Sequence, residues 1–177
     1  SAEQSITASG AGLVLAGLVY ESATVDFSGP LHAHRLLLAA TGEEADVDIA
    51  LAGDWTDPLW RGTLEKADWQ YPGAGEWVLQ QPVALELGTA RIAVPATCWV
   101  QDDAQLCVDA AGDPAAALEA SARLESFPLS ALRALQKAPV TLGNKVDADM
   151  HAALHAGQLK TADLQVRLGA GSVTYAD

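Results

Sequence analysis

The sequence predicts an all-β protein of antiparallel strands, and two features of the chain lead to this fold class. Apolar and polar residues alternate along most of the chain, and a period of two places them on opposite faces of a strand. Short segments rich in glycine, proline, asparagine and aspartate separate the alternating runs. This close spacing favours antiparallel pairing of consecutive strands over crossover helices.

Roughly a dozen strands are expected from this pattern. The first lies in the apolar run 11–20, which is about half as long as a membrane-spanning helix, so a buried strand is the better interpretation. The clearest alternating runs after it are residues 46–51, 83–87, 118–125, 145–150 and 164–168. Turns are expected at 28–30, 41–43, 71–73, 87–89, 111–114, 142–144 and 169–171.

One segment departs from the period of two and predicts a short amphipathic helix at about residues 128–137. Leu129, Leu132 and Leu135 are three positions apart, Pro128 suits a first helical position, and Pro139 follows the far end. The helix is expected to cover the end of a sheet. No linker-like tract divides the chain, so residues 1–177 are expected to form a single β-rich segment of a longer protein.

Cys98 and Cys107 are the two cysteines of the chain, and their spacing favours a disulfide. Nine positions match neither a Cys-x-x-Cys redox motif nor half of a zinc site. Residues 91–94 and 105–108 are plausible strands, with the stretch between them looping out and two aspartates at its tip. Free buried thiols are the alternative. Because disulfides persist outside the cytosol, the pair indicates an oxidising compartment.

The charge balance argues against nucleic acid as a partner. Ten Lys and Arg face 23 Asp and Glu, for a formal net charge of -13. Such a chain repels DNA, RNA and anionic membrane surfaces, which carry charge of the same sign.

No metal, cofactor or catalytic activity is expected. His32 and His34 share a strand face, but no cysteine or acidic residue lies near them at zinc-ligand spacing. His151 and His155 have helical spacing without a His-Glu-x-x-His motif. The adjacent carboxylates at 43–44 and 102–103 diverge on a strand, and the sequence has no nucleophile elbow, P-loop or Rossmann fingerprint. The protein is therefore not expected to be an enzyme.

A series of short motifs gives the chain a family resemblance. In order they are WRGTL at 60–64, EWVLQQP at 76–82, VALEL at 83–87, CW…LC at 98–107 and FPLSAL at 127–132. Their succession resembles the TamB family of bacterial envelope proteins, over residues 29–143. No single motif is specific, but several in this order at similar spacing make coincidence unlikely.

The resemblance implies an elongated, curved antiparallel sheet that folds into an open hydrophobic groove, a β-taco-like architecture. Members of the family have an inner-membrane anchor, a β-rich body crossing the periplasm of Gram-negative bacteria and a C-terminal region that docks onto the outer-membrane barrel protein TamA. They are implicated in phospholipid transport between the two membranes and in outer-membrane protein assembly. This chain resembles an internal, periplasmic segment, so contact with TamA is expected through the full-length protein and not through this segment.

A groove for phospholipid acyl chains needs a continuous wall of uncharged aliphatic side chains. Each methylene shielded from water contributes about 0.8 kcal/mol, so a tail of roughly 16 carbons gains on the order of 10 kcal/mol. The alternating strands supply as candidate lining Leu36, Leu38, Val47, Ile49, Leu51, Leu64, Leu85, Leu87, Ile92, Val94, Leu118 and Leu124.

Three alternatives remain open at the level of sequence. The same alternation fills the core of an ordinary β-sandwich. Exposed strand edges of a structural or chaperone scaffold could receive the β-strands of outer-membrane proteins without lipid conduction. The five tryptophans could stack on sugars, although Trp60 and Trp77 share strand faces with leucines and are better interpreted as core residues.

Overall fold

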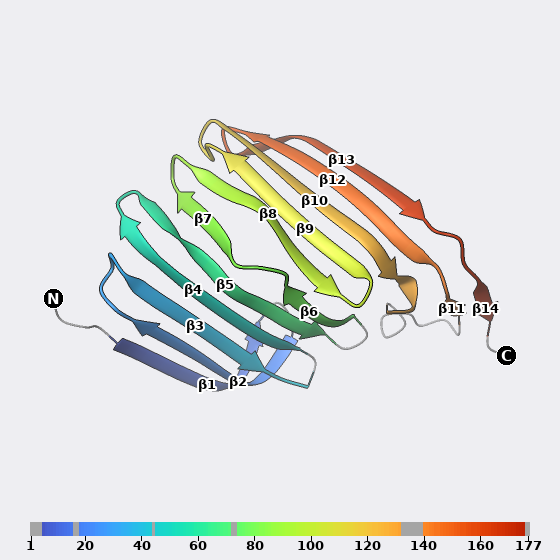
Figure 1. Cartoon of the computed structure of the whole chain (residues 1–177), viewed down its shortest axis with the longest axis horizontal. Helices are drawn as coiled ribbons and strands as arrows, with labels where there is room; N and C mark the ends of the chain where they lie inside the picture. The colour runs from blue at the N-terminus through green and yellow to red at the C-terminus, as the bar shows by residue number, and fades with distance from the viewer. Residues whose placement is uncertain (1–4, 16–17, 44, 72–73, 132–139, 176–177) are drawn as a thin grey trace.

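The protein is one large antiparallel sheet (Figure 1), seen in a computed structural model that describes residues 5–15, 18–43, 45–71, 74–131 and 140–175. The prediction of an all-β fold is confirmed. The strands are β1 (Ser5–Leu15), β2 (Leu18–Ser28), β3 (His34–Thr41), β4 (Asp46–Thr56), β5 (Leu59–Tyr71), β6 (Gly75–Leu79), β7 (Val83–Gly88), β8 (Ile92–Gln101), β9 (Ala104–Gly112), β10 (Ala117–Pro128), β11 (Val140–Leu142), β12 (Lys145–His155), β13 (Gln158–Leu168) and β14 (Val173–Tyr175).

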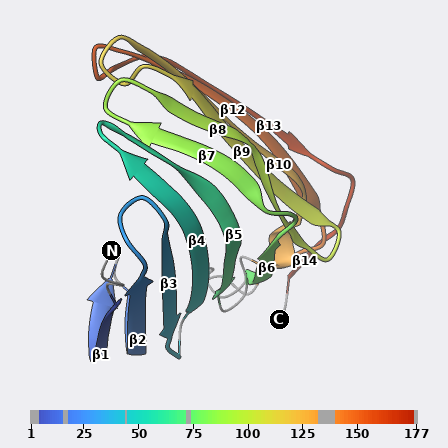
Figure 2. The same ribbon diagram turned by 60° about the vertical axis from the view of Figure 1, so that its left-hand side comes forward.

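The sheet follows the chain almost in sequence order. Its twelve strands run β1-β2-β3-β4-β5-β6-β8-β9-β10-β12-β13, with β7 beside β5 and β8, and β11 pairs with β14 separately. Substantial contacts between strands join only hydrogen-bonded neighbours, so the described strands form a single layer and not a β-sandwich. Figure 2 shows that this layer is curved. No helix within the described ranges is long and apolar enough to span a membrane.

The position between β5 and β8 is shared by two short strands, β6 and β7, and the ladder is interrupted where they meet. Side chains replace the missing backbone bonds in this β6–β7 gap. The indole Nε1 of Trp99 donates to the carbonyl oxygen of Ala67 at 2.6 Å, and the backbone N–H of Leu79 donates to Asp68 Oδ1 at 3.0 Å. Because buried backbone groups are costly to leave unpaired, these two bonds keep the sheet continuous.

The expected disulfide is present: Cys98 on β8 is bonded to Cys107 on β9, with Cα atoms 4.0 Å apart. The expected loop between the cysteines is wrong. The two residues are direct cross-strand partners, β8 continues to Gln101, and only Asp102 and Asp103 turn the chain. Asp102 has a φ of 49°, which aspartate tolerates and a two-residue hairpin requires.

The disulfide follows directly after a bulge in β8. Val94 pairs with Ala110 but Thr97 pairs with Val108, so β8 carries one extra residue. A shift of one residue reverses the face to which every later side chain points. By joining Cys98 to its direct partner, the disulfide fixes the register immediately beyond the bulge.

One further expectation about local structure is wrong, and another is wrong at its start. The run 11–20 divides between β1 and β2, and although Tyr20 is 6% exposed, Val14 and Val19 are 70% and 51% exposed. The reason is that β1 lies at the edge of the sheet and that β2 pairs with β3 only from Ser22 onward. Of the helix expected at 128–137, Pro128 still pairs with Lys145 as part of β10, and residues 129–131 form a 3₁₀ turn, so the expected start is wrong. Residues 132–137 lie outside the described ranges.

Removing the disulfide with the double substitution Cys98→Ala and Cys107→Ala is expected to lower the free energy of unfolding by about 2–3 kcal/mol, because a closed loop restricts the unfolded chain. Urea unfolding monitored by tryptophan fluorescence measures the change. A reducing agent should shift the wild-type midpoint and leave that of the double variant where it is. Equal midpoints for oxidised wild type and variant would contradict the role given to the disulfide.

Candidate functional site

The register of the sheet defines one continuous apolar face. Direct cross-strand partners point to the same side, so the pairings can be followed from β1 to β13. The apolar face consists of Ile6 and Ala8; Ala23, Val25 and Phe27; His34, Leu36, Leu38 and Ala40; Val47, Ile49, Leu51, Gly53 and Trp55; Trp60, Gly62, Leu64, Ala67 and Trp69; Trp77 and Leu79; Val83, Leu85 and Leu87; Ile92, Val94, Thr97 and Trp99; Leu106, Val108 and Ala110; Leu118, Ala120, Ala122, Leu124 and Phe127; Val146, Ala148, Met150, Ala152 and Leu154; Leu159, Ala162, Leu164, Val166 and Leu168.

Every residue expected from the sequence to line a groove lies on this face. Most are half-buried, and Leu87 is 39% exposed. Their role in binding lipid stays a prediction, but their common side is an observation. The residues are Leu36, Leu38, Val47, Ile49, Leu51, Leu64, Leu85, Leu87, Ile92, Val94, Leu118 and Leu124.

Charged side chains are segregated onto the opposite, polar face. None of the residues that define the apolar face is Asp, Glu, Lys or Arg. Ion pairs instead link neighbouring strands across the polar face: Arg61 and Arg91 flank Glu86, and Arg123 and Arg167 flank Asp149. The apolar face is therefore uncharged, whereas the polar face mixes charged side chains with apolar ones such as Leu37 and Val78.

The ion pairs shift the titration of their members. The guanidinium of Arg91, followed by that of Arg61, holds the pKa of Glu86 below its ordinary value. Arg123 and Arg167 likewise lower the pKa of Asp149, and hydrogen bonding to Asp48 raises the pKa of Lys66. These ion pairs lie at the surface in contact with water, which screens the interactions, so their contribution to stability is small.

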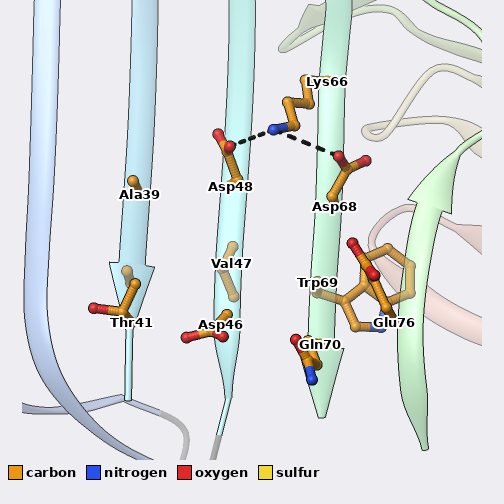
Figure 3. Close-up of a pocket in the computed structure, with 11 residues that line it drawn as sticks. Ala39, Thr41, Asp46, Val47, Asp48, Lys66, Asp68, Trp69, Gln70 and Glu76 are labelled. Carbon is orange, nitrogen blue, oxygen red and sulfur yellow. Dashed lines mark hydrogen bonds and ion pairs between the residues drawn. The ribbon is translucent and has the colours of Figure 1, made fainter.

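The hollow drawn in Figure 3 belongs mainly to the polar face. It has a volume of about 310 Å³, and Lys66 reaches between Asp48 and Asp68, with its ammonium 3.6 Å from Asp68 Oδ2. Asp46 and Glu76 add further carboxylates. The lysine charge is thus already paired, and the hollow is a charged surface distinct from the apolar face.

An aromatic cluster closes one end of the apolar face, and we call it the closed end. Trp69 lies 6.1 Å from Trp77 and 5.1 Å from Trp99 between ring centroids, and Trp77 lies 6.2 Å from Phe127. Trp77 is only 4% exposed and Phe127 9%. Ala131 of the 3₁₀ turn packs against the cluster, so this end of the face is covered.

A second aromatic group lies at the other end, which we call the open end. The Trp60 indole lies over two facing glycines: a Cβ on Gly53 or Gly62 would come within 2.6 or 2.4 Å of its ring. Trp60 Nε1 donates to His34 Nε2 at 2.8 Å, and Phe27 stacks on His34 with ring centroids 5.4 Å apart. Only part of this group could be recognised in the sequence, from the spacing of Trp60 and Gly62, because the facing glycine comes from another strand.

The histidines do not assemble a metal site in the described structure. His34 is engaged with Trp60, and His32 lies in the turn before β3. His151 and His155 lie on strand β12 and not on a helix. Across the described ranges, no group of three or more His, Cys, Asp and Glu could hold a metal ion.

Comparison with known proteins assigns a family to the chain. Residues 2–177 match the family model described as the N-terminal domain of TamB. The match extends beyond residues 29–143, the stretch that carries the short motifs. No solved structure matches the chain.

Replacing Trp99 with phenylalanine is expected to lower the free energy of unfolding by about 1–3 kcal/mol, because the carbonyl of Ala67 loses its donor in the β6–β7 gap. Urea unfolding measures the loss. Trp55→Phe is the matched control: Trp55 is 45% exposed, so its change should stay within about 0.5 kcal/mol. Equal effects of the two substitutions would show that the gap does not depend on this bond.

Asp149→Asn is expected to destabilise the chain at neutral pH and to have no effect in strong acid. Because the pKa of Asp149 is lower in the folded state, its carboxylate stabilises the fold at pH values above the ordinary pKa of 3.8. This contribution is lost as the pH falls through the lowered pKa. Urea midpoints of wild type and variant should therefore converge as the pH is lowered. Asp163→Asn on β13, outside this ion-pair group, is the control, and a difference that persists in acid would contradict the assignment.

Proposed function

The chain belongs to the TamB family, and from this premise we propose that its apolar face binds phospholipid acyl chains during transport between the inner and outer membranes. One observation carries the proposal. The described strands form a single-layer sheet with one uncharged face, and no second layer of strands packs on that face.

An apolar face of this extent favours an occupant. Soluble monomers rarely expose contiguous apolar patches beyond a few hundred Å², whereas this face continues through the twelve strands of the large sheet. An acyl chain covered by the face gains about 0.8 kcal/mol per methylene. Because the face has no charged groups to fix a polar ligand, it suits a flexible hydrocarbon chain.

The net charge of the protein favours binding of the lipid through its acyl chains and not through its head group. The formal net charge of -13 repels anionic phosphate groups, and the polar face carries all of the ion pairs described above. The head groups are best left in water beyond the edge of the apolar face. The role is one of binding and conduction, without catalysis.

The disulfide supports an oxidising compartment, and for this family the proposed location is the periplasm, in a protein anchored in the inner membrane. Contact with the outer-membrane barrel protein TamA is assigned to the full-length protein. A contribution to outer-membrane protein assembly belongs to the same proposal, because a barrel protein needs a supplied lipid bilayer around it.

Photocrosslinking amino acids test the proposal in cells that express the full-length protein. Probes replacing Leu85 or Leu118 on the apolar face should capture phospholipid, because their side chains point into the proposed binding surface. Probes at the adjacent residues Glu86 and Glu119 point to the polar face and are the matched controls. Lipid captured only by the control positions, or by none, would contradict the proposal.

A second candidate function, a scaffold that receives outer-membrane β-strands, is favoured by the edge of the sheet. Among the described strands β13 pairs with β12 alone, and its residues Leu164 and Leu168 are 66% and 68% exposed. A free strand edge offers backbone donors and acceptors to another strand. Capture of polypeptide by a probe at Leu164, with no lipid at Leu85, would favour this function over lipid conduction.

A further inference from the structure

The two ends of the apolar face differ, and the difference points to one orientation of the bound lipid. We propose that each phospholipid lies along the strands, with its acyl chains directed toward the aromatic cluster of the closed end and its head group leaving at the open end. The inference rests on the proposed function and adds an orientation that lipid binding alone does not require.

The closed end is a buried aromatic cluster that is poorly suited to a head group. Trp77, Ala104 and Phe127 are 4%, 2% and 9% exposed. Two of the three indole nitrogens there are already used within the fold: Trp77 Nε1 donates to the carbonyl of Ala74 at 3.1 Å, and Trp99 Nε1 donates to that of Ala67. A phosphate would lose its hydration against this buried cluster, a cost that the two engaged indoles cannot offset, whereas a terminal methyl group loses nothing.

The open end is a boundary between apolar surface and water. Trp55 and Leu87 remain 45% and 39% exposed there, and Trp60 and His34 carry polar ring atoms beside Phe27. Side chains with an apolar body and a polar tip suit the zone between hydrocarbon and head groups. The side chains of Arg61 and Arg91 at the same end are 53% and 65% exposed, although both pair with Glu86.

The length of the face fits one acyl chain between its ends. Trp60 and Trp69 are nine positions apart on β5, which corresponds to roughly 30 Å of strand. The Trp60 ring folds back over Gly62 and the Trp69 ring occupies the other end, so the free stretch is shorter. A bilayer core of about 30 Å holds two opposed leaflets, or about 15 Å per chain. One acyl chain therefore fits along a strand. Successive lipids must then lie side by side, each over the next strands of the sheet.

The orientation is tested by locating the carbon to which a photoprobe attaches. Benzophenone probes replace Leu87 or Ile92 at the open end and Leu106 or Leu124 at the closed end of the full-length protein, and fragmentation mass spectrometry maps each lipid adduct. Open-end probes should label the glycerol region and the first acyl carbons, and closed-end probes the methyl end. Because a reversed lipid would desolvate its phosphate, the ratio of the two adduct classes should differ by about tenfold or more between the ends.

The outcomes separate this inference from the function on which it rests. Lipid adducts with the same carbon distribution at both ends, or with the opposite distribution, would overturn the orientation and leave lipid binding in place. Lipid adducts at none of the four positions would overturn both. The use of two positions at each end keeps the test valid if one probe disturbs the fold.

Discussion

The hydrogen-bonded register from β1 to β13 is the constraint on which the two-faced character of this protein depends. A slip of one residue in any ladder would bring the charged side chains of every later strand onto the apolar face. The ladder nevertheless contains bulges, for example between Leu124 and Phe127 and between Val94 and Thr97. At each of these the apolar pattern of the sequence changes phase by one residue, so the face is preserved. The phase changes and the bulges therefore compensate one another, and curvature is gained without mixing the faces.

The same logic explains how much of the structure could be predicted from the sequence. A period of two is local, so the side on which Leu36 or Leu118 lies could be inferred without knowing which strands are neighbours. The composition around Asp102 and Asp103 predicts a longer loop than the two-residue turn that is present. The turn depends on the positive φ of Asp102, which composition does not reveal. The helix predicted after Phe127 is wrong at its first residue. Phe127 and Pro128 pair with β12, and this pairing outweighs the local preference for a helix.

The aromatic ends of the apolar face could not be predicted, because each is assembled from several strands. The Trp60 ring has room only because Gly53 on β4 faces Gly62 on β5. Trp99 reaches the carbonyl of Ala67 only because β6 and β7 leave the ladder open between them. Neither condition is a property of a single segment. Tryptophans that alternation identifies simply as apolar thus become the features that make one end of the face covered and the other open.

The covalent and ionic links between strands lie on the polar face, which agrees with the proposed function of the apolar face. A single-layer sheet cannot bury its apolar face against a second sheet, so its stability comes from the backbone ladder and from links between strands. The Cys98–Cys107 disulfide and the ion pairs around Glu86 and Asp149 all lie on the polar face, where they do not obstruct a ligand. A hydrocarbon occupant would then supply the missing burial, and by mass action any molecule that binds only the folded sheet also stabilises it. Under the proposed function, binding on the apolar face and folding of the sheet are therefore coupled, and the covalent link on the polar face maintains the register without occupying the apolar face.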